Sequence, residues 1–142
     1  MRLTEVFPYW RECRAVLLAC LQGLSPADLA WVPPGGRNGI GCLAAHIARV
    51  HDRDVTQGVL GRPPLLPRNW DPRTVEELVT PLEALGELLW DYLARSGAEI
   101  LEKGHGTRPV KDLLGNAWIE ELHHRGQIFF LLRLLGREPP AI

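Results

Sequence analysis

The sequence predicts an all-α protein in which four amphipathic helices pack as a bundle. In four separate segments apolar residues recur at steps of three and four, which is the spacing of one helix face. No segment shows sustained alternation of apolar and polar residues, the pattern of a half-buried strand. Each segment has only one apolar face, so that none is expected to be stable alone and all four are expected to pack together.

The composition is that of a globular protein, and we expect a single domain over residues 1–142. Of the residues 46% are hydrophobic and 23% are charged, and the formal net charge of -1 favours neither nucleic acid nor an anionic membrane. The longest apolar run, Ala15 to Leu21, is too short to span a membrane, and Glu5 interrupts any signal segment. We therefore expect a cytoplasmic protein that acts on a small molecule.

Three cysteines without C-x-x-C spacing are expected to be buried free thiols: Cys13, Cys20 and Cys42.

The first helix is predicted from about Pro8 to Gln22, with Gly23 as its terminator. Its apolar stripe consists of Trp10, Cys13, Leu17, Cys20, Leu21 and Leu24. A short helical turn should follow, because Ser25 can cap it and Pro26 suits the first helical position.

The second helix is predicted from Gly39 to about Leu60, with an apolar stripe that also contains His46. Its apolar members are Leu43, Ile47 and Val50. Four prolines make the stretch Gly61 to Arg73 a loop.

The third helix is predicted to begin at Thr80, because Thr80-Pro81-Leu82-Glu83 combines a cap, a first-position proline and an acidic third residue. It should end near Gly97. The fourth helix is predicted from about Pro109 to Leu135, with Gly136 after its end. The apolar stripe of the fourth helix is Val110, Leu113, Leu114, Ala117, Ile128, Leu131, Leu132 and Leu135.

Polar residues interrupt the apolar stripe of the fourth helix, where Glu120 and His124 stand one helical turn apart. A buried carboxylate needs a cation, a hydrogen-bond network or solvent, because burying it unpaired costs several kcal/mol. A metal ion meets this need, and His46 on the second helix is the candidate for a third ligand. Three protein ligands would leave one coordination position for water or substrate.

Other interpretations of these residues stay open from spacing alone. His46 fits equally a hydrogen-bonded packing residue, and Glu120 with His124 fits a helical surface pair. Glu121 lies nearer the centre of the apolar stripe than Glu120, which makes it an alternative ligand, and its spacing also suits an ion pair with Arg125.

The remaining polar candidates are expected to lie outside the site. His123 projects about a hundred degrees away from His124, so that it should be a surface residue or a neighbour of a ligand. His51 is expected to be exposed. Asp52 and Asp54 suit a solvated face, with Asp54 also a candidate for orienting a ligand.

Two motifs resemble those of the DinB-like (DinB/YfiT) superfamily of four-helix metalloproteins. The first is the string His123-His124-Arg125-Gly126-Gln127-Ile128, followed by Leu132-Arg133, Gly136, Pro139 and Pro140. The second is Asn38-Gly39-Ile40-Gly41-Cys42-Leu43-Ala44-Ala45-His46-Ile47. Both occur in the family's order and at nearly its separation, so the resemblance spans essentially the whole chain.

The resemblance implies a ligand set of His46, Glu120 and His124. In many members the residue four before the His of the His-Arg-Gly-Gln string is a second His, and here it is Glu120. The branch of mycothiol-dependent maleylpyruvate isomerases is similar to this chain in having Glu at that place, so the family register selects Glu120 over Glu121. The implied cofactor is one divalent ion, zinc first, with nickel, iron and manganese as alternatives.

Relatives in this family include thiol S-transferases that use bacillithiol or mycothiol. The resemblance therefore implies a metal-dependent thiol transferase or isomerase, with a low-molecular-weight thiol as cosubstrate and with His51, Asp54 or Gln127 as assisting residues. The alternatives are a metal-dependent hydrolase and a non-catalytic, metal-stabilised stress-response module. Three aromatic residues are candidates for a homodimer face or a pocket rim: Trp31, Trp70 and Trp90.

Overall fold

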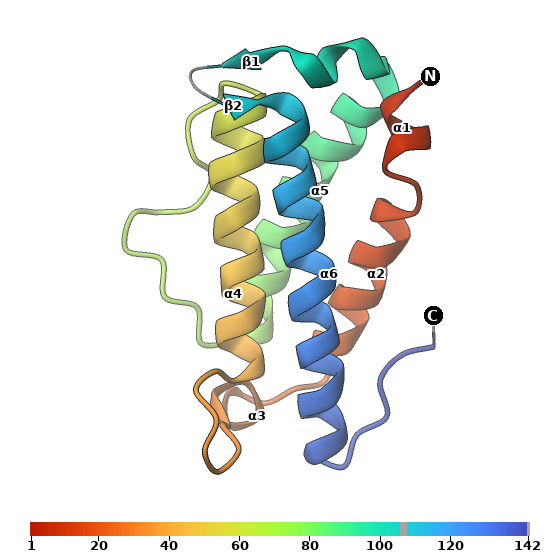
Figure 1. The fold of residues 1–142 in the computed structure, drawn as a ribbon. Helices are drawn as coiled ribbons and strands as arrows, with labels where there is room; N and C mark the ends of the chain where they lie inside the picture. Colours follow the sequence, from red (N-terminus) through yellow and green to blue (C-terminus); the bar gives the residue numbers. More distant parts are fainter. Residues whose placement is uncertain (106–107, 142) are drawn as a thin grey trace.

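Four long helices form the protein, as the sequence predicts (Figure 1). The computed structural model describes residues 1–105 and 108–141. Its long elements are α2 (Trp10–Leu21), α4 (Ile40–His51) with its extension η1 (Asp52–Val59), α5 (Val75–Arg95) and α6 (Val110–Leu134). The short elements are α1 (Leu3–Val6), α3 (Pro26–Ala30), η2 (Ala98–Glu102) and the antiparallel pair β1 (Gly104–His105) and β2 (Arg108–Pro109). Within the described residues, no helix combines the length and the apolar character that crossing a membrane requires.

The short helix α3 forms for the reason that its sequence suggests. The Ser25 hydroxyl accepts a hydrogen bond from the backbone N–H of Asp28, and the Asp28 carboxylate accepts one from the N–H of Ser25, both at 3.0 Å. Pro26 occupies the first helical position, where its missing N–H costs nothing. The prediction of a short helical turn at this place is confirmed.

The second predicted helix is one continuous element, but its second half is a π-helix. Residues Asp52–Val59 continue α4 with i to i+5 hydrogen bonds, a wider winding that is rare in proteins and frequent at functional sites. Asp52 lies buried there, and its carboxylate accepts hydrogen bonds from the backbone N–H groups of Leu65 and Leu66 at 2.9 and 3.1 Å. The expectation that Asp52 belongs to a solvated face is therefore wrong, because it fastens the loop that follows η1.

The predicted start of the third helix at Thr80 is also wrong. Helix α5 begins at Val75, where the Thr74 hydroxyl accepts a hydrogen bond from the N–H of Glu77 at 3.2 Å. The earlier start is favoured because it adds Leu78, which is fully buried, to the apolar face. Pro81 consequently lies inside the helix and removes one intrahelical hydrogen bond.

The core lies where the apolar faces of the long helices meet, and it contains two clusters of buried side chains. Cys20 belongs to the core, whereas Cys13 is half-buried and Cys42 is exposed, so that only one of the three thiols is buried as predicted. Helices α4 and α6 lie side by side along the bundle (Figure 1), and they pack closely against each other. The rim of this α4–α6 contact carries the polar residues of the candidate site.

Candidate metal centre

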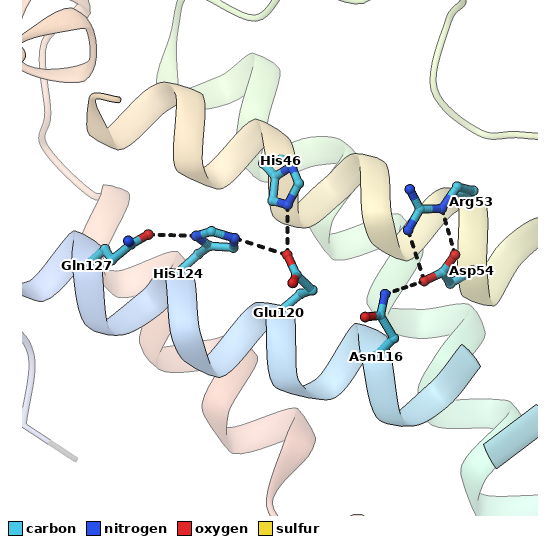
Figure 2. Close-up of polar contacts among 7 residues, drawn as sticks. All are labelled: His46, Arg53, Asp54, Asn116, Glu120, His124 and Gln127. Carbon is cyan, nitrogen blue, oxygen red and sulfur yellow. Dashed lines mark hydrogen bonds and ion pairs between the residues drawn. The ribbon is translucent and has the colours of Figure 1, made fainter. Parts of the chain in front are cut away.

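The three predicted ligands meet across the contact between α4 and α6 (Figure 2). His46 Nε2 lies 2.8 Å from Glu120 Oε2, and His124 Nε2 lies 3.0 Å from the same oxygen. One ligand atom from each residue lies within 4.8 Å of the other two. The group could therefore hold a metal ion, and both histidines direct their Nε2 atoms at one carboxylate oxygen.

This group lies at the rim of the bundle and not in its core. The side chains of His124, Glu120 and His46 are 17%, 30% and 46% exposed, respectively. The sequence pattern predicted an inner face for all three, and the structure places them partly in solvent. A ligand or substrate can therefore approach the group from outside without moving the core.

A hydrogen bond to Gln127 fixes which ring nitrogen of His124 carries a proton. The Nδ1 atom of His124 lies 2.6 Å from Gln127 Oε1, which can only accept, so that Nδ1 carries the proton (Figure 2). A neutral His124 then has a lone pair on Nε2 that faces the Glu120 carboxylate. Two electron-pair donors in contact need a cation between them, either a proton or a metal ion.

Glu120 is ionised in this setting. The hydrogen bond with His46 lowers the pKa of Glu120, burial opposes this shift, and the hydrogen bond with His124 adds to the lowering. One carboxylate and two imidazoles are a common zinc set, and tetrahedral zinc separates its nitrogen and oxygen ligands by roughly 3.3 Å. The observed 2.8 and 3.0 Å are shorter by a few tenths of an ångström, so a small outward movement of the side chains makes room for the ion.

A second polar cluster lies beside the first, around Asp54. The Asp54 carboxylate accepts hydrogen bonds from Arg53 at 2.7 and 3.2 Å and from Asn116 Nδ2 at 2.7 Å (Figure 2). Burial raises the pKa of Asp54, but the hydrogen bonds from Arg53 and Asn116 outweigh it and the net shift is downward. Asp54 is 2% exposed, so the expectation of a solvated face is wrong, and its partners are Arg53 and Asn116 rather than a histidine of the site.

Glu121 belongs to a different, fully buried cluster on another face of α6. Its carboxylate accepts hydrogen bonds from Trp10 Nε1 at 2.6 Å and from the Nε and Nη2 atoms of Arg14. The same guanidinium donates to the Leu82 carbonyl at 2.8 Å and to His51 Nδ1 at 2.7 Å. Arg14 on α2 thus contacts α4, α5 and α6 at once, and Glu121 is occupied by protein donors.

The ion pair predicted between Glu121 and Arg125 does not form. The Arg125 guanidinium lies over the ring of Phe129 instead, 5.3 Å from the ring centre. Glu121 is fully buried, as its central place in the apolar stripe suggests, and it bonds to Arg14. Its burial is satisfied by a cation from the protein, whereas Glu120 faces the two histidines.

His51 is buried, which corrects the expectation that it is exposed. It is 1% exposed, and because a guanidinium can only donate, its Nδ1 must accept from Arg14. Burial, and then the Arg14 charge, hold the pKa of His51 well below 6.5, so His51 is neutral. His123 is exposed, as predicted, and its ring lies 4.9 Å from that of His124.

A pocket of about 490 Å³ lies at the end of the α4–α6 contact, and its lining includes His123 and Gln127 but not His124 itself. It shares Gln127 and His123 with the surroundings of His124, and apolar side chains such as Phe130 and Leu43 complete it. The three tryptophans proposed for a rim or a dimer face are half-buried and pack on the core clusters: Trp31, Trp70 and Trp90.

Sequence reasoning missed Arg14, Arg53 and Asn116. Arg14 stands four residues after Trp10 and three before Leu17, inside the apolar stripe, which is the same signal that singled out Glu120. Asn116 stands four residues before Glu120 and was detectable as part of the same helix face.

The all-α fold agrees with what comparison with known proteins shows. A family model described as the DinB superfamily matches residues 9–128, which cover α2 to most of α6. No curated protein matches the chain.

Proposed function

The chain belongs to the DinB superfamily, and from this membership we propose that it binds one divalent metal ion through His46, Glu120 and His124. We propose zinc as the ion, and a thiol-dependent transfer or isomerisation as the reaction. The observation that carries the proposal is the convergence of two Nε2 atoms on one ionised carboxylate oxygen at the solvent-facing rim. Nickel, iron and manganese are the alternative ions for the same donor set.

The protein's own residues orient and expose the site. Gln127 keeps the proton of His124 on Nδ1, so that Nε2 is free to donate its lone pair. Glu120 supplies negative charge, and the exposed edge of His46 leaves one side open to a small molecule. When bound, a divalent ion would lower the pKa of a coordinated thiol and favour the thiolate at neutral pH.

The proposed cosubstrate is a low-molecular-weight thiol of the bacillithiol or mycothiol type. In a transfer, its sulfur forms a bond to an electrophilic carbon of the second substrate, the leaving group departs with its electron pair, and the thiol proton passes to solvent. The chain's own Cys20 does not supply this sulfur, because burial raises the pKa of its thiol to about 11.

The metal proposal is tested by metal analysis of untagged protein purified without added metal. We expect about one divalent ion per chain, and we expect Glu120→Gln to bind zinc far more weakly in a competition titration. Glu83→Gln is the matched control, because Glu83 is an exposed glutamate on α5. A wild-type chain that neither carries metal nor binds added zinc would overturn the proposal.

The reaction is tested with zinc-loaded protein and a panel of thiols and electrophiles. Thioether formation that requires both the thiol and the metal supports the transferase. Hydrolysis of an ester substrate without any thiol would instead indicate a metal-dependent hydrolase. An effect of the metal on stability alone would indicate a non-catalytic module.

A further inference from the structure

We propose that Arg53 is the anion-binding residue of this site, and that the substrate or cosubstrate carries a carboxylate a few bonds from its metal-binding atom. This inference rests on the proposed function, since it concerns a ligand held at His46, Glu120 and His124. It adds the chemical class of that ligand, which neither the family nor the three donor residues specify.

Arg53 lies on the same side of the α4–η1 element as His46. The two residues are seven positions apart, about two helical turns, which returns a side chain to the same face. On the facing helix, Asn116 stands one turn, or roughly 6 Å, before Glu120. Asn116 and Arg53 both bind Asp54, so the Arg53 guanidinium lies near Asn116. It is therefore about one turn along the α4–α6 contact from the proposed metal ligands (Figure 2).

The Arg53 guanidinium is held in place by Asp54, but some of its N–H donors remain available to a ligand. Its Nε and Nη2 atoms both donate to the Asp54 carboxylate, which is buried and is also held by Asn116. Among the described residues Nη1 has no hydrogen-bond partner, and the Arg53 side chain is 63% exposed. An arginine whose plane is fixed and whose remaining donors face solvent is prepared to bind a carboxylate, because little side-chain entropy is lost.

The charges around Arg53 would favour an anion once a divalent ion is bound. Hydrogen bonding to Asp54 raises the pKa of Arg53, and the Glu120 carboxylate adds to this shift, so the field of the donor group reaches the guanidinium. Arg108 also acts on Asp54, lowering its pKa after Arg53 and Asn116. The two arginines therefore balance the carboxylates of Asp54 and Glu120. A bound divalent ion would then leave a net positive charge at this side of the bundle.

The test compares two thiols with the zinc-loaded protein by calorimetry. The probes are 3-mercaptopropionate and its neutral amide, 3-mercaptopropionamide. We expect Arg53→Gln to reduce the preference of the wild type for the acid by about tenfold, the loss of one charged hydrogen-bonded contact. Arg53→Lys should retain part of the preference, and zinc affinity should stay unchanged in both variants. Arg95→Gln is the control, because Arg95 is 59% exposed and also pairs with an aspartate, Asp91.

The outcomes separate this inference from the proposed function. A wild type that binds zinc but shows the same acid preference as Arg53→Gln overturns the inference alone. Loss of zinc affinity in Arg53→Gln also overturns it, because Arg53 would then support the donor group and not the ligand. A wild type that binds no zinc overturns the proposed function and this inference with it.

Discussion

Glu120 and Glu121 are adjacent in the sequence and have the same chemistry, yet they have opposite roles in the structure. Glu121 is fully buried and bonds to Arg14 and Trp10, whereas Glu120 is partly exposed and faces His46 and His124. Periodicity places Glu121 in the core, but it cannot reveal which partner satisfies a buried carboxylate. That partner comes from α2, more than a hundred positions away in the chain.

The two glutamates should separate stability from metal affinity. Glu121→Gln leaves the Arg14 guanidinium buried without its counter-charge, and we expect it to lower the free energy of unfolding by about 3–5 kcal/mol. The zinc affinity of Glu121→Gln should fall by at most roughly ten- to a hundredfold, which is the usual loss when a residue that supports a metal site without binding the metal is changed. Urea unfolding of the metal-free variants and zinc titration measure the two effects.

Glu120→Gln should behave in the opposite way, with the larger loss of zinc affinity and the smaller loss of stability. Its side chain is partly exposed, so little desolvation is at stake. If Glu121→Gln proves the more damaging change in the zinc titration, the ligand set must be redrawn as His46, Glu121 and His124.

His51 should make stability fall in mild acid. Its folded pKa lies well below 6.5, so below about pH 6.5 the unfolded chain takes up a proton that the folded chain does not. The free energy of unfolding then decreases by up to about 1.4 kcal/mol per pH unit from this residue, and its contribution is fully present only above that pH. Urea unfolding of the metal-free protein at pH 7.5 and 5.5 measures the slope.

His51→Asn should flatten this slope, because its amide oxygen can accept from Arg14 without titrating. His123→Asn is the control, since His123 is exposed. An unchanged slope in His51→Asn would show that other groups cause the loss of stability in acid.

Among the elements, α5 shows how two equivalent signals compete. The Thr-x-x-Glu pattern occurs at Thr74 and again at Thr80, and only the first is a cap. Both patterns satisfy local chemistry, and the buried face that extends through Leu78 decides between them. Pro81 favours the later pattern as a helix start, but the helix accommodates this proline in its interior.

Thr74→Ala should therefore destabilise the protein by about 1 kcal/mol, the usual loss for a helix cap. Thr80→Ala at an exposed position inside the helix should change the free energy of unfolding by less than that. Denaturant unfolding of the two variants decides the matter. A larger effect at Thr80 than at Thr74 would contradict the observed start of α5.

The long helices α2 and α6 were predictable to within about two residues, because each carries a sustained apolar stripe and clear end signals. The π-helical winding of η1 was not predictable, since it goes with contacts that Asp52 and Asp54 make to other segments. The four residues of α1 are too few for periodicity, and that helix is positioned by the hydrogen bond from the Leu3 N–H to the Ser96 carbonyl.

For the site, the family motifs singled out His46, Glu120 and His124, and the structure brings all three together. Their role as ligands stays a prediction. Gln127 was one of several assisting candidates, and its bond to His124 was not readable from a spacing of three. Arg53 was missed because its neighbour Asp54 was interpreted as a solvated charge.

At the scale of the whole molecule, zinc should stabilise the fold by binding only the folded chain. At a free zinc concentration of a hundred times Kd, the gain is about 2.7 kcal/mol, which corresponds to a rise in Tm of roughly 5–10 °C. Scanning calorimetry with and without a chelator measures the shift. Glu83→Gln should show the full shift and Glu120→Gln almost none, and an equal shift in both would place the bound zinc elsewhere.

The Arg14 guanidinium also determines how α6 is turned about its own axis. One residue along a helix is a rotation of about 100°, so turning α6 by one position would bring Glu121 into the place of Glu120 and turn Glu120 away from His46. A bundle of leucines alone resists such a rotation weakly, because cores tolerate repacking of similar apolar residues. Here the rotation would separate Glu121 from Arg14 and bury an unmatched cation. The orientation that directs Glu120 and His124 towards His46 is thus selected by a residue that touches none of the three.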